Sequence, residues 1–436
     1  MLRLDSASFA ARRARLLQLL PEGAALLLPT NPELLRSGDS HFPFRPHSDF
    51  FYVTGLQEPE AWALLKRGGE DEGLSLFVLP KDPEREVWTG IRVGVEGAKE
   101  EYGADRAWPL AEFTEQLGRL LADVEELHFA FGRHPHAEPR VMEVLATVRS
   151  GRKAALGPSR IVDPSGLLAE MRLRKGDDEL ALMRQGAVIT HEAHVAAMEQ
   201  VRPGMKEYEI QALVEYTFRR RGAWGWAYPS IVGGGANACI LHYVSNNGTF
   251  GDNDLMLIDA GAEVDGYATD VTRTSPVTGR FTPAQKALYE LVLASQVEAV
   301  EATRPGANID AIHDGVVRTL TAGLIDLGLL TGTVDDAIEE KHFRRFYMHR
   351  TSHWLGLDVH DVGRYLMTDG PRPLEPGMVI TIEPGLYVSP DDEAVPAEFR
   401  GIGIRIEDDV LVTADGHENL TAAIPKTVAD IEALRS

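Results

Sequence analysis

The chain has 436 residues, 44% of them hydrophobic and 25% charged, which excludes the disordered and fibrous classes and allows two or three domains. Its 66 acidic residues against 44 basic ones give a formal charge of -22, which disfavours a nucleic-acid or an anionic-membrane partner. The single cysteine, Cys239, cannot form an internal disulfide, so we expect a protein of the reducing cytoplasm.

The N-terminal stretch MLRLDSASFAARRARLLQLLPEG has two interpretations. Its arginines and its amphipathic pattern are compatible with a mitochondrial address. The favoured interpretation is a folded helix with Ser6 or Ser8 as its N-cap, ending at Pro21 before the strand-like ALLLP. No apolar run approaches the roughly 20 residues of a membrane span, so no membrane partner is expected.

The first part of the chain shows a mixture of strand and helix patterns. The predicted strands are ALLLP, FFYVTG, SLFVLP and EVWTG, and the stretch from Phe113 to Val124 is a predicted helix. The turn-rich segment LGPSRIVDPSG then leads to a cluster of charges, MRLRKGDDEL, which places a boundary at about Lys175. We therefore expect an α/β domain over residues 1–174 and a second domain over residues 175–436.

The second domain alternates long helical patterns with short apolar runs. The helical patterns cover residues 177–200, 206–221, 283–303 and 309–327. The strand-like runs cover residues 255–260, 267–275, 378–383 and 402–412. Helices that are segregated onto a mostly antiparallel sheet make an α+β domain.

A β-hairpin is predicted in LIDAGAEVDGYATDVTRTS, where two apolar runs flank a V-D-G turn signal. With a two-residue loop at 264–265, Asp259 sits opposite Asp270. With a loop at 265–266, Asp259 faces Thr272 and Asp270 is its diagonal neighbour. Opposed side chains have Cβ atoms about 5 Å apart, and like charges there destabilise the pairing. Either register therefore calls for a positive charge between the two carboxylates.

Three later segments are candidates for the same site. The loop MHRTSHWLGLDVHDVG contains three histidines, namely His349, His353 and His360. The apolar strand MVITIEPGLYV is broken by proline and glycine just after Glu383. In GIGIRIEDDVLV the isoleucines face one way while Arg405 and Glu407 share the other face, because side chains alternate along a strand.

Each of these features alone has an ordinary explanation as a turn residue, a strand end, an ion pair or a satisfied histidine. Together they place four carboxylates in apolar strands, where each would cost several kcal/mol if it were buried without a partner. Two divalent ions neutralise four negative charges, and one neutral histidine adds a nitrogen ligand without charge. Such an oxygen-rich donor set favours Mn²⁺ over a thiolate zinc site and predicts metal-assisted hydrolysis.

The motif order DAG, DVTRT, HWLGLDVHDVG, IEPGLY and GIRIEDD resembles the dinuclear metallopeptidases of the pita-bread fold. With HFPFRPHSDFFYVTGLQEPEAW, EVWTG, GGGANACILHY and ENLTAAIPK added, the chain is similar to the Xaa-Pro aminopeptidases (aminopeptidase P) along essentially its whole length. The resemblance implies a pita-bread catalytic domain behind an α/β N-terminal domain. It implies five metal ligands for two ions. Asp259 chelates one ion, and Asp270 and Glu407 bridge both. His353 binds one ion and Glu383 binds the other.

The resemblance also implies supporting roles around the metals. It places His242, in ILHY, beside the scissile bond, and it has His360 hydrogen-bond the peptide carbonyl and the developing oxyanion. His349 and Tyr387 are expected to line the pocket. Arg405 is expected to hold the carboxylate ligands in place.

The activity that the resemblance implies is hydrolysis of the bond between an N-terminal residue and a following proline. A hydroxide bridging two divalent ions would attack the carbonyl, and Glu383 would move its proton. The ions are expected to be Mn²⁺, with Zn²⁺ or Co²⁺ as alternatives. Two other functions stay open, namely a prolidase that cleaves only Xaa-Pro dipeptides and a pita-bread binding module without catalysis.

The assembly and the substrate range are less defined. Members of the family form homodimers or homotetramers in which a neighbour's N-terminal domain shapes the active site, and Trp88 in EVWTG is the candidate for that contact. Arg350 and Thr351 depart from the family pattern, which has a glycine followed by a small or apolar residue. A long cation there narrows the pocket, grips a substrate carboxylate, or points to solvent.

Overall fold

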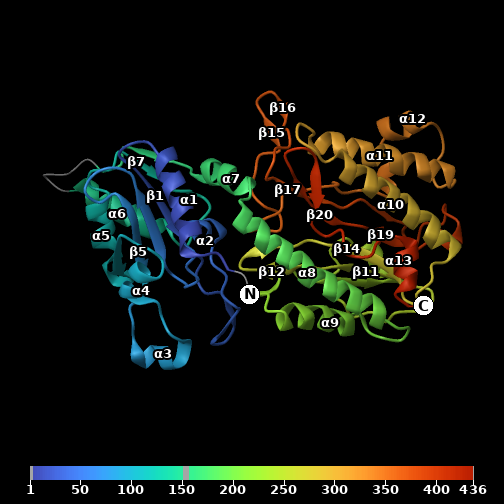
Figure 1. Ribbon diagram of the computed structural model, residues 1–436, viewed down its shortest axis with the longest axis horizontal. Coiled ribbons are helices and arrows are strands. Elements are labelled where there is room, and N and C mark those ends of the chain that lie inside the picture. The colour runs from blue at the N-terminus through green and yellow to red at the C-terminus, as the bar shows by residue number, and fades with distance from the viewer. Residues whose placement is uncertain (1–2, 151–156, 436) are drawn as a thin grey trace. The chain divides into compact units, whose positions relative to one another are not determined.

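The computed structural model describes residues 3–150 and 157–435, and the chain divides into two compact units (Figure 1). One unit comprises Leu4–Glu170, and the other runs from Met171 onward. The helix α7 (Ser165–Leu173) crosses this division, which falls shortly before Lys175, where the sequence places the boundary.

The N-terminal unit is built on one mixed sheet. Its helices are α1 (Ser6–Leu19), α2 (Ser48–Thr54), α3 (Pro83–Thr89), α4 (Gly94–Glu100), α5 (Phe113–Leu120) and α6 (Glu138–Ser150), with a 3-10 turn at Leu110–Glu112. Its strands are β1 (Ala24–Pro29), β2 (Leu35–Ser37), β3 (Ser40–His41), β4 (Trp62–Lys66), β5 (Gly73–Val78), β6 (Arg106–Pro109), β7 (Glu126–His128) and β8 (Arg160–Val162). The sheet order is β6-β5-β4-β1-β7-β8, with β1 antiparallel to β4 and parallel to β7.

Strand β1 is apolar throughout because both of its faces are covered. All six of its residues are buried. Ala25 and Leu27 share a core cluster with residues of α5 and α6, and the alternate residues of a strand point to the other face of the sheet. On that helical side the rings of Trp62 and Phe113 lie 4.5 Å apart between centroids. The α/β character expected from the sequence is therefore present in this unit.

Two of the predicted strands in this unit are wrong. FFYVTG lies in α2, whose last residue is followed by Gly55 in the left-handed conformation, with φ of 72°. Short buried apolar runs do not distinguish a strand from a helix by periodicity. EVWTG lies in α3, which begins at Pro83 behind Asp82, whose side chain accepts the Arg85 N–H. An Asp-Pro pair is a helix-start signal, and it outweighs the β-branched residues that follow.

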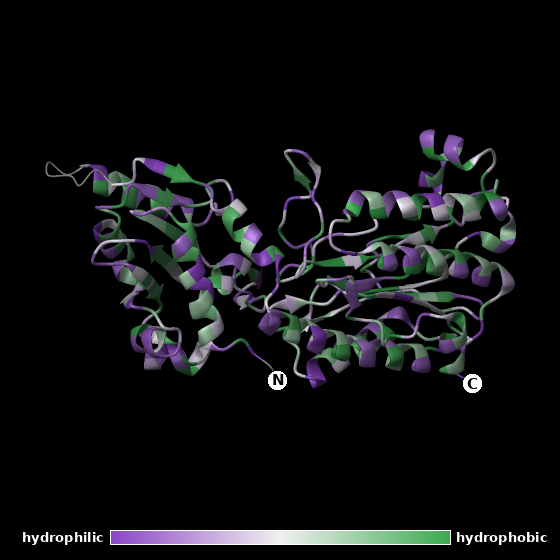
Figure 2. Cartoon of the chain, turned by 45° about the horizontal axis from the view of Figure 1, so that its top comes forward, coloured by the Kyte–Doolittle hydropathy of each residue, from purple (hydrophilic) through white to green (hydrophobic). Residues whose placement is uncertain are grey.

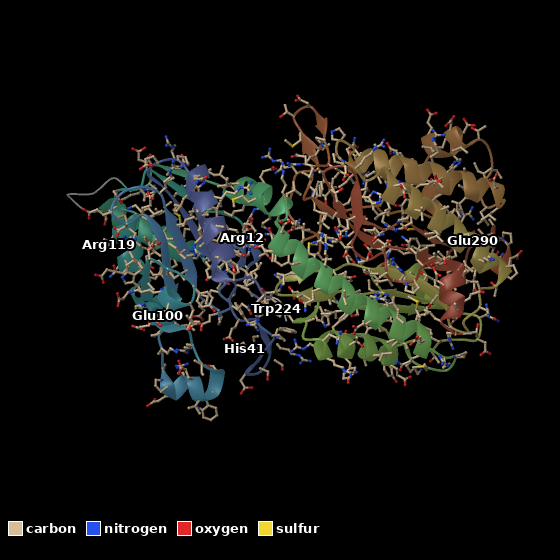
Figure 3. All side chains as sticks on the ribbon, viewed as in Figure 1. Arg12, His41, Glu100, Arg119, Trp224 and Glu290 are labelled. Atoms are coloured by element: carbon tan, nitrogen blue, oxygen red, sulfur yellow. The ribbon has the colours of Figure 1, made fainter. Side chains whose placement is uncertain are left out.

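Helix α1 confirms the favoured interpretation of the N-terminal stretch, with one correction. Its N-cap is Asp5, whose carboxylate accepts the Ser8 backbone N–H at 2.8 Å, so neither Ser6 nor Ser8 has that role. Arg12 of this helix, labelled in Figure 3, is buried and lies 4.3 Å from the Tyr52 ring centroid. Its arginines therefore include residues that pack within the unit.

The C-terminal unit combines long helices with short antiparallel sheets. Its helices after α7 are α8 (Asp177–Gln200), α9 (Glu207–Arg220), α10 (Pro283–Ala302), α11 (Ile309–Asp326), α12 (Val334–Glu339) and α13 (Val428–Ala433), with 3-10 turns at Gly235–Cys239, His342–Arg345 and Ala397–Phe399. Its strands are β9 (Gly225–Trp226), β10 (Ile231–Gly234), β11 (Leu255–Asp259), β12 (Ala262–Val264), β13 (Tyr267–Ala268), β14 (Thr272–Pro276), β15 (Leu366–Met367), β16 (Gly370–Pro371), β17 (Val379–Ile382), β18 (Gly385–Tyr387), β19 (Gly403–Arg405), β20 (Asp408–Val412) and β21 (His417–Asn419).

The strands of this unit form the floor on which the helices pack. The sheets have the orders β10-β11-β14, β13-β12-β9, β17-β20-β21, β18-β19 and β15-β16, and the pairings are antiparallel. Helices α8 and α9 lie on one side of the strands and α10 and α11 on the other (Figure 1). The four predicted long helices and the α+β class are therefore confirmed.

The main hydrophobic core of this unit lies between α10, α11 and the strands β17 to β20. It includes Leu288 and Val292 of α10 and Ile380 and Ile382 of β17, all fully buried. Hydrophobic and hydrophilic residues alternate along the helices (Figure 2), and Glu290, labelled in Figure 3, is exposed on α10. Within the described part of the chain, no helix combines the length and the apolar character needed to cross a membrane.

Two of the predicted strands are each broken in two. The run 267–275 becomes β13 and β14, and the run 402–412 becomes β19 and β20. Asp270 and Glu407 lie in these two breaks. The Asp270 backbone N–H donates to the side chain of Asp409 at 3.1 Å, and the Glu407 N–H donates to the Thr272 carbonyl at 3.0 Å. Both acidic residues thus leave the regular ladder with their backbone donors satisfied.

Candidate metal centre and active site

The predicted hairpin adopts the register in which Asp259 faces Thr272. The loop consists of Asp265 and Gly266, which have φ of 48° and 84°, as a two-residue turn with left-handed residues requires. Asp259 ends β11, and Asp270 lies diagonally beyond its partner. The hairpin therefore presents both carboxylates at the same end of the β11–β14 pair.

Glu383 and Glu407 arrive from a second antiparallel pair. In the β17–β20 ladder the last pairing is Ile382 with Asp408. Glu383 and Glu407 come one residue beyond that pairing on their respective strands. The end of this ladder thus supplies two more carboxylates.

His353 comes from the long loop between the 3-10 turn His342–Arg345 and β15. Its backbone N–H donates to the Thr381 hydroxyl at 3.1 Å, and its Nδ1–H donates to the Trp354 carbonyl at 3.0 Å. The Nε2 atom is then left as a ligand atom. It lies 3.4 Å from Asp270 Oδ2 and 3.5 Å from Glu383 Oε1.

The donor set fits divalent cations. One ligand atom each from Asp270, His353 and Glu407 lie within 4.8 Å of one another. Burial and the neighbouring carboxylates raise the pKa of Glu407 well above its usual range and that of Glu383 to about 7. Although burial alone would lower it, the contact with Asp270 raises the pKa of His353 to about 9. These shifts express an excess of negative charge that bound cations would neutralise.

Asp259 lies beside this group and is held by two donors. The Tyr228 hydroxyl donates to Asp259 Oδ1 at 2.6 Å, and Arg405 Nη2 contacts Oδ2 at 2.6 Å. Arg405 also donates from Nε to the Thr272 hydroxyl at 3.0 Å, and that hydroxyl donates to Glu407 Oε2 at 2.8 Å. Arg405 therefore fixes two of the carboxylates, one directly and one through Thr272.

Three residues of this network were not predicted as members of the site, although the hairpin register names Thr272 as the partner of Asp259. Tyr228 comes from the segment between β9 and β10. Thr272 is the first residue of β14, and Asp409 is the second residue after Glu407. Asp409 is buried, and its Oδ1 has no hydrogen-bond partner among the described residues. For Asp409 the sequence does contain a signal, because an acidic residue in the apolar run EDDVLV is expected to be buried. Tyr228 and Thr272 had none, because their roles depend on contacts distant in sequence.

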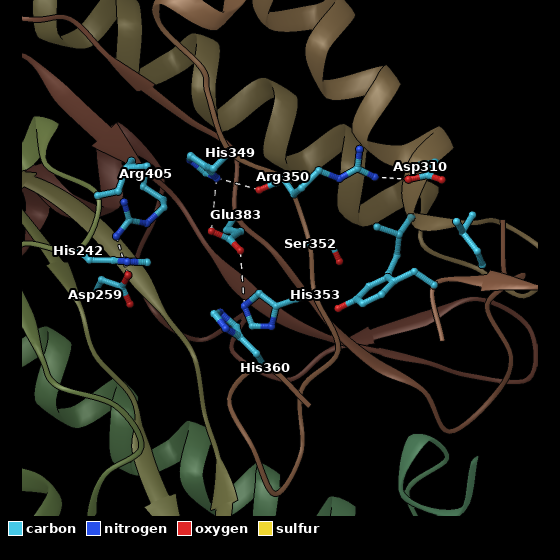
Figure 4. A pocket seen from close by; sticks show the side chains of 14 residues that line it. His242, Asp259, Asp310, His349, Arg350, Ser352, His353, His360, Glu383 and Arg405 are labelled. Carbon is cyan, nitrogen blue, oxygen red and sulfur yellow. Dashed lines mark hydrogen bonds and ion pairs between the residues drawn. The ribbon is translucent and has the colours of Figure 1, made fainter. Parts of the chain in front are cut away.

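A cavity of about 720 Å³ opens beside these ligands (Figure 4). The residues lining it are Leu241, His242, Asp259, Ile309, Asp310, His349, Arg350, Ser352, His353, His360, Tyr365, Leu366, Glu383 and Arg405. Carboxylates and imidazoles gather at one end of the cavity, while Arg350 reaches toward Asp310 at the other (Figure 4). Asp270 and Glu407 are buried outside this lining set.

The three further histidines predicted at the site all line this cavity. His242 lies in the turn that follows the 3-10 turn Gly235–Cys239. His349 is held by its own loop, because Nδ1 contacts the Arg350 carbonyl at 2.8 Å. Burial lowers the pKa of His349 to about 3, so this imidazole is neutral. His360 lies with its ring 4.4 Å from that of His353, between centroids.

Tyr387 and Trp88 differ from the expected pocket residues. Tyr387 is buried beneath the site, where its hydroxyl contacts His349 Nε2 at 2.8 Å and accepts from Arg405 Nη1 at 3.0 Å. It is therefore placed to support other residues. Trp88 lies in α3 of the N-terminal unit and is 87% exposed.

Arg350 and Thr351 diverge in their placement. Arg350 lines the cavity and forms an ion pair with Asp310 at the start of α11, with more than half of the Arg350 side chain exposed. Thr351 is fully buried, and its hydroxyl contacts the Tyr347 hydroxyl at 2.7 Å and His313 Nδ1 at 2.8 Å. Only the arginine of this pair can therefore contact a ligand in the cavity.

Comparison with known proteins gives the same picture over the whole chain. Residues 181–414 match metallopeptidase family M24, and residues 9–128 match the aminopeptidase P N-terminal domain. The Xaa-Pro aminopeptidase of Escherichia coli K12 is 45% identical over 436 residues, covering 100% of this chain and 98% of that protein. Human Xaa-Pro aminopeptidase 3 is 34% identical, covering 99% of this chain and 86% of that protein.

Solved structures agree with this. Pseudomonas aeruginosa aminopeptidase PepP superposes with a TM-score of 0.98 at 46% identity, covering 100% of this chain and 98% of that one. E. coli aminopeptidase P with the inhibitor Pro-Leu superposes with a TM-score of 0.96 at 44% identity, covering 99% and 98%. The fold expected from the sequence is confirmed, with the aminopeptidase P N-terminal domain followed in the chain by a pita-bread catalytic domain.

Proposed function

The chain belongs to metallopeptidase family M24 in its aminopeptidase P branch, and from this membership we propose that it removes the N-terminal residue of peptides whose second residue is proline. The observation that carries this proposal is the convergence of Asp270, His353 and Glu407 within 4.8 Å beside a cavity of peptide size. The acidic end of that cavity suits a substrate whose recognised end is a cation.

Five side chains would hold two divalent ions, namely Asp259, Asp270, His353, Glu383 and Glu407. Four of the five supply oxygen and one supplies nitrogen, which favours Mn²⁺, with Zn²⁺ and Co²⁺ as alternatives. When bound, the ions supply a Lewis acid for the scissile carbonyl and lower the pKa of a nearby water. Asp259 and Glu383 lie outside the 4.8 Å group, which suits a ligand set shared between two ions.

Substrate recognition begins with the free α-ammonium group of the peptide. Asp259 and Glu383 line the cavity with carboxylates, which attract that cation and disfavour a peptide without a free amine. His242 and His349 line the same region and flank the scissile bond. The requirement for a free N-terminus follows from the charge of this end of the cavity.

Catalysis requires one proton to move from water to the leaving nitrogen. Glu383 accepts the proton from the water that attacks the carbonyl carbon. When the C–N bond breaks, Glu383 delivers that proton to the proline nitrogen, which becomes a secondary amine. His360 donates a hydrogen bond to the oxygen on which negative charge develops. Proline has no amide N–H to bind, so the shape of the cavity selects it.

The experiment that tests this function compares two substrate lengths. The Mn²⁺-loaded protein should hydrolyse an Arg-Pro-Pro-type tripeptide efficiently and Xaa-Pro dipeptides poorly, and Asp270→Ala should lose both metal and activity. Efficient cleavage of dipeptides alone would establish a prolidase instead, an alternative that the Xaa-Pro aminopeptidase relatives do not favour. An unchanged metal content and activity in Asp270→Ala would exclude the proposed centre.

Assembly and location complete the proposal. We expect a homodimer or homotetramer in which the exposed Trp88 of one subunit contacts the peptide site of another, and sedimentation of wild type and Trp88→Ala checks this. The single cysteine, Cys239, favours the reducing cytoplasm. Burial raises the pKa of its thiol to about 12, so it is not a reactive thiolate.

A further inference from the structure

Two buried, positively charged side chains form ion pairs with the loop that contains His360. Arg172 Nη2 contacts Asp361 Oδ1 at 2.5 Å, and Lys175 Nζ contacts Asp361 Oδ2 at 3.2 Å. The exposed fractions of these side chains are 2% for Arg172, 0% for Lys175 and 1% for Asp361. Arg172 lies in the last turn of α7 and Lys175 just before α8, so a short connecting segment supplies both charges.

Arg172 also binds a second residue of this loop. Arg172 Nη2 also contacts Asp358 Oδ2 at 2.6 Å, so one guanidinium holds two points of the chain. A Cβ atom on Gly356 would lie 2.1 Å from Asp361 Oδ2 and 3.0 Å from Lys175 Cε. Only glycine fits at that position with the two charges in place.

Burying three charges is expensive, and the fold does not require it for hydrophobic packing. Buried charges cost several kcal/mol each, a cost that is offset only by excellent pairing geometry, and an apolar set of similar volume is often as stable. Both oxygens of Asp361 are engaged by separate cations, which fixes the rotation of its side chain as well as its position. Such an arrangement specifies one loop conformation.

His360 depends on that conformation. Among the described residues its imidazole has no hydrogen-bond partner, and its ring contacts that of His353 edge-on, with an interplanar angle of 78°. The next residue, Asp361, donates its backbone N–H to the Trp354 carbonyl at 2.9 Å. The place of the His360 ring is therefore set by the backbone, and the backbone is held through Asp361.

We propose that Arg172 and Lys175 are positioning residues that hold His360 against the scissile carbonyl by anchoring Asp361. The proposal rests on the proposed function, in which His360 donates to the developing oxyanion. The contacts described above join the two cations to Asp358 and Asp361 of the loop. They act through the loop, and a displacement of about 1 Å in a catalytic group is enough to cost roughly 100-fold in rate.

The test is a double-mutant cycle on the full-length, Mn²⁺-loaded protein with a tripeptide substrate. Lys175→Met is measured alone and in a His360→Ala background. Alone it should lower kcat roughly 10- to 100-fold with KM nearly unchanged. In the His360→Ala background the same substitution should have no further effect, because the group that it positions is gone. The matched control Lys286→Met, at an exposed position of α10, should change neither constant.

Two outcomes would overturn the proposal. An equal loss of kcat in both backgrounds would show that Lys175 acts on general stability, and an unchanged kcat would show that the charge is not needed. Where Lys175→Met fails to fold, Asp358→Asn replaces it, because this side chain is 39% exposed and shares the Arg172 contact. It should show a smaller loss with the same dependence on His360.

A crystal structure of Lys175→Met separates this proposal from the proposed function. The His360 ring should move relative to His353, and this holds whatever peptide the enzyme cleaves. An unmoved ring would contradict the positioning role even if the tripeptide activity is found. A displaced ring in a protein that cleaves no proline peptide would leave the anchor intact and overturn the function.

Discussion

Replacing Tyr228 with phenylalanine removes one hydroxyl from the support of the metal centre. That hydroxyl donates to Asp259 Oδ1 at 2.6 Å, and the other oxygen of this proposed ligand is held by Arg405. Burial and the neighbouring carboxylates, Asp259 first, raise the pKa of Tyr228 well above its usual range, so it keeps its proton and remains a donor. The substitution changes nothing else in size or shape.

The expected magnitude follows from the type of bond. A hydrogen bond to a charged group contributes about 1.5–3 kcal/mol, and each 1.4 kcal/mol is a factor of ten in an equilibrium constant. Loss of this bond should therefore weaken Mn²⁺ binding roughly 10- to 100-fold, the range typical of residues that hold metal ligands. At saturating Mn²⁺ most of the peptidase activity should return.

Calorimetric titration of the metal-free variant with Mn²⁺ measures the effect directly. Tyr216→Phe, at an exposed position of α9, is the matched control and should bind as the wild type does. If Tyr228→Phe binds Mn²⁺ within twofold of the wild type, Asp259 either does not depend on this donor or is not a ligand. The reasoning about the support of the site would then be wrong.

Three further predictions concern stability. Arg273→Met removes a buried partner of Asp408 and should lower the free energy of unfolding, measured by urea denaturation, by about 3–5 kcal/mol. Arg280→Met removes an exposed ion pair and should leave the urea midpoint nearly unchanged. Similar midpoints for the two variants would contradict this prediction. Chelation of the metal should lower the melting temperature, since ligand at 100 times Kd adds about 2.7 kcal/mol, and identical melting curves would count against the centre. Burial lowers the pKa of His194 from its ordinary value of 6.5 to about 4. Between these two pH values His194 is protonated in the unfolded chain and neutral in the folded chain, so the free energy of unfolding should fall as the pH drops through this range. The fall should be less steep in His194→Gln.

The long helices were predictable because each carries its own start and stop signals. Helix α8 has the predicted bounds, and the Glu179 side chain accepts the Gly176 N–H at 2.9 Å, which satisfies a backbone donor at the start of the helix. The fully buried run in α2 was not predictable. There the choice between helix and strand was made by packing and by Gly55, which ends the helix in a left-handed conformation.

The residues of the candidate site could be selected from the sequence, whereas their arrangement could be predicted only in part. The two alternative hairpin registers both brought Asp259 and Asp270 together, and the structure adopts the one with the Asp265–Gly266 loop. The strand breaks around Asp270 were not foreseen, because alternation predicts only which face a residue occupies. Tyr228 was missed since its contact depends on where the segment after β9 passes, which no local pattern encodes.

The assembly of the centre from four separated segments has a consequence for biosynthesis. Asp259 leaves the ribosome long before Glu407, which comes much later in the chain, and contacts of such sequence separation form late in folding. A nascent chain would have only part of the ligand set until the β17–β20 ladder closes. Binding of cations by all of the proposed ligands would therefore require the β17–β20 ladder to have formed.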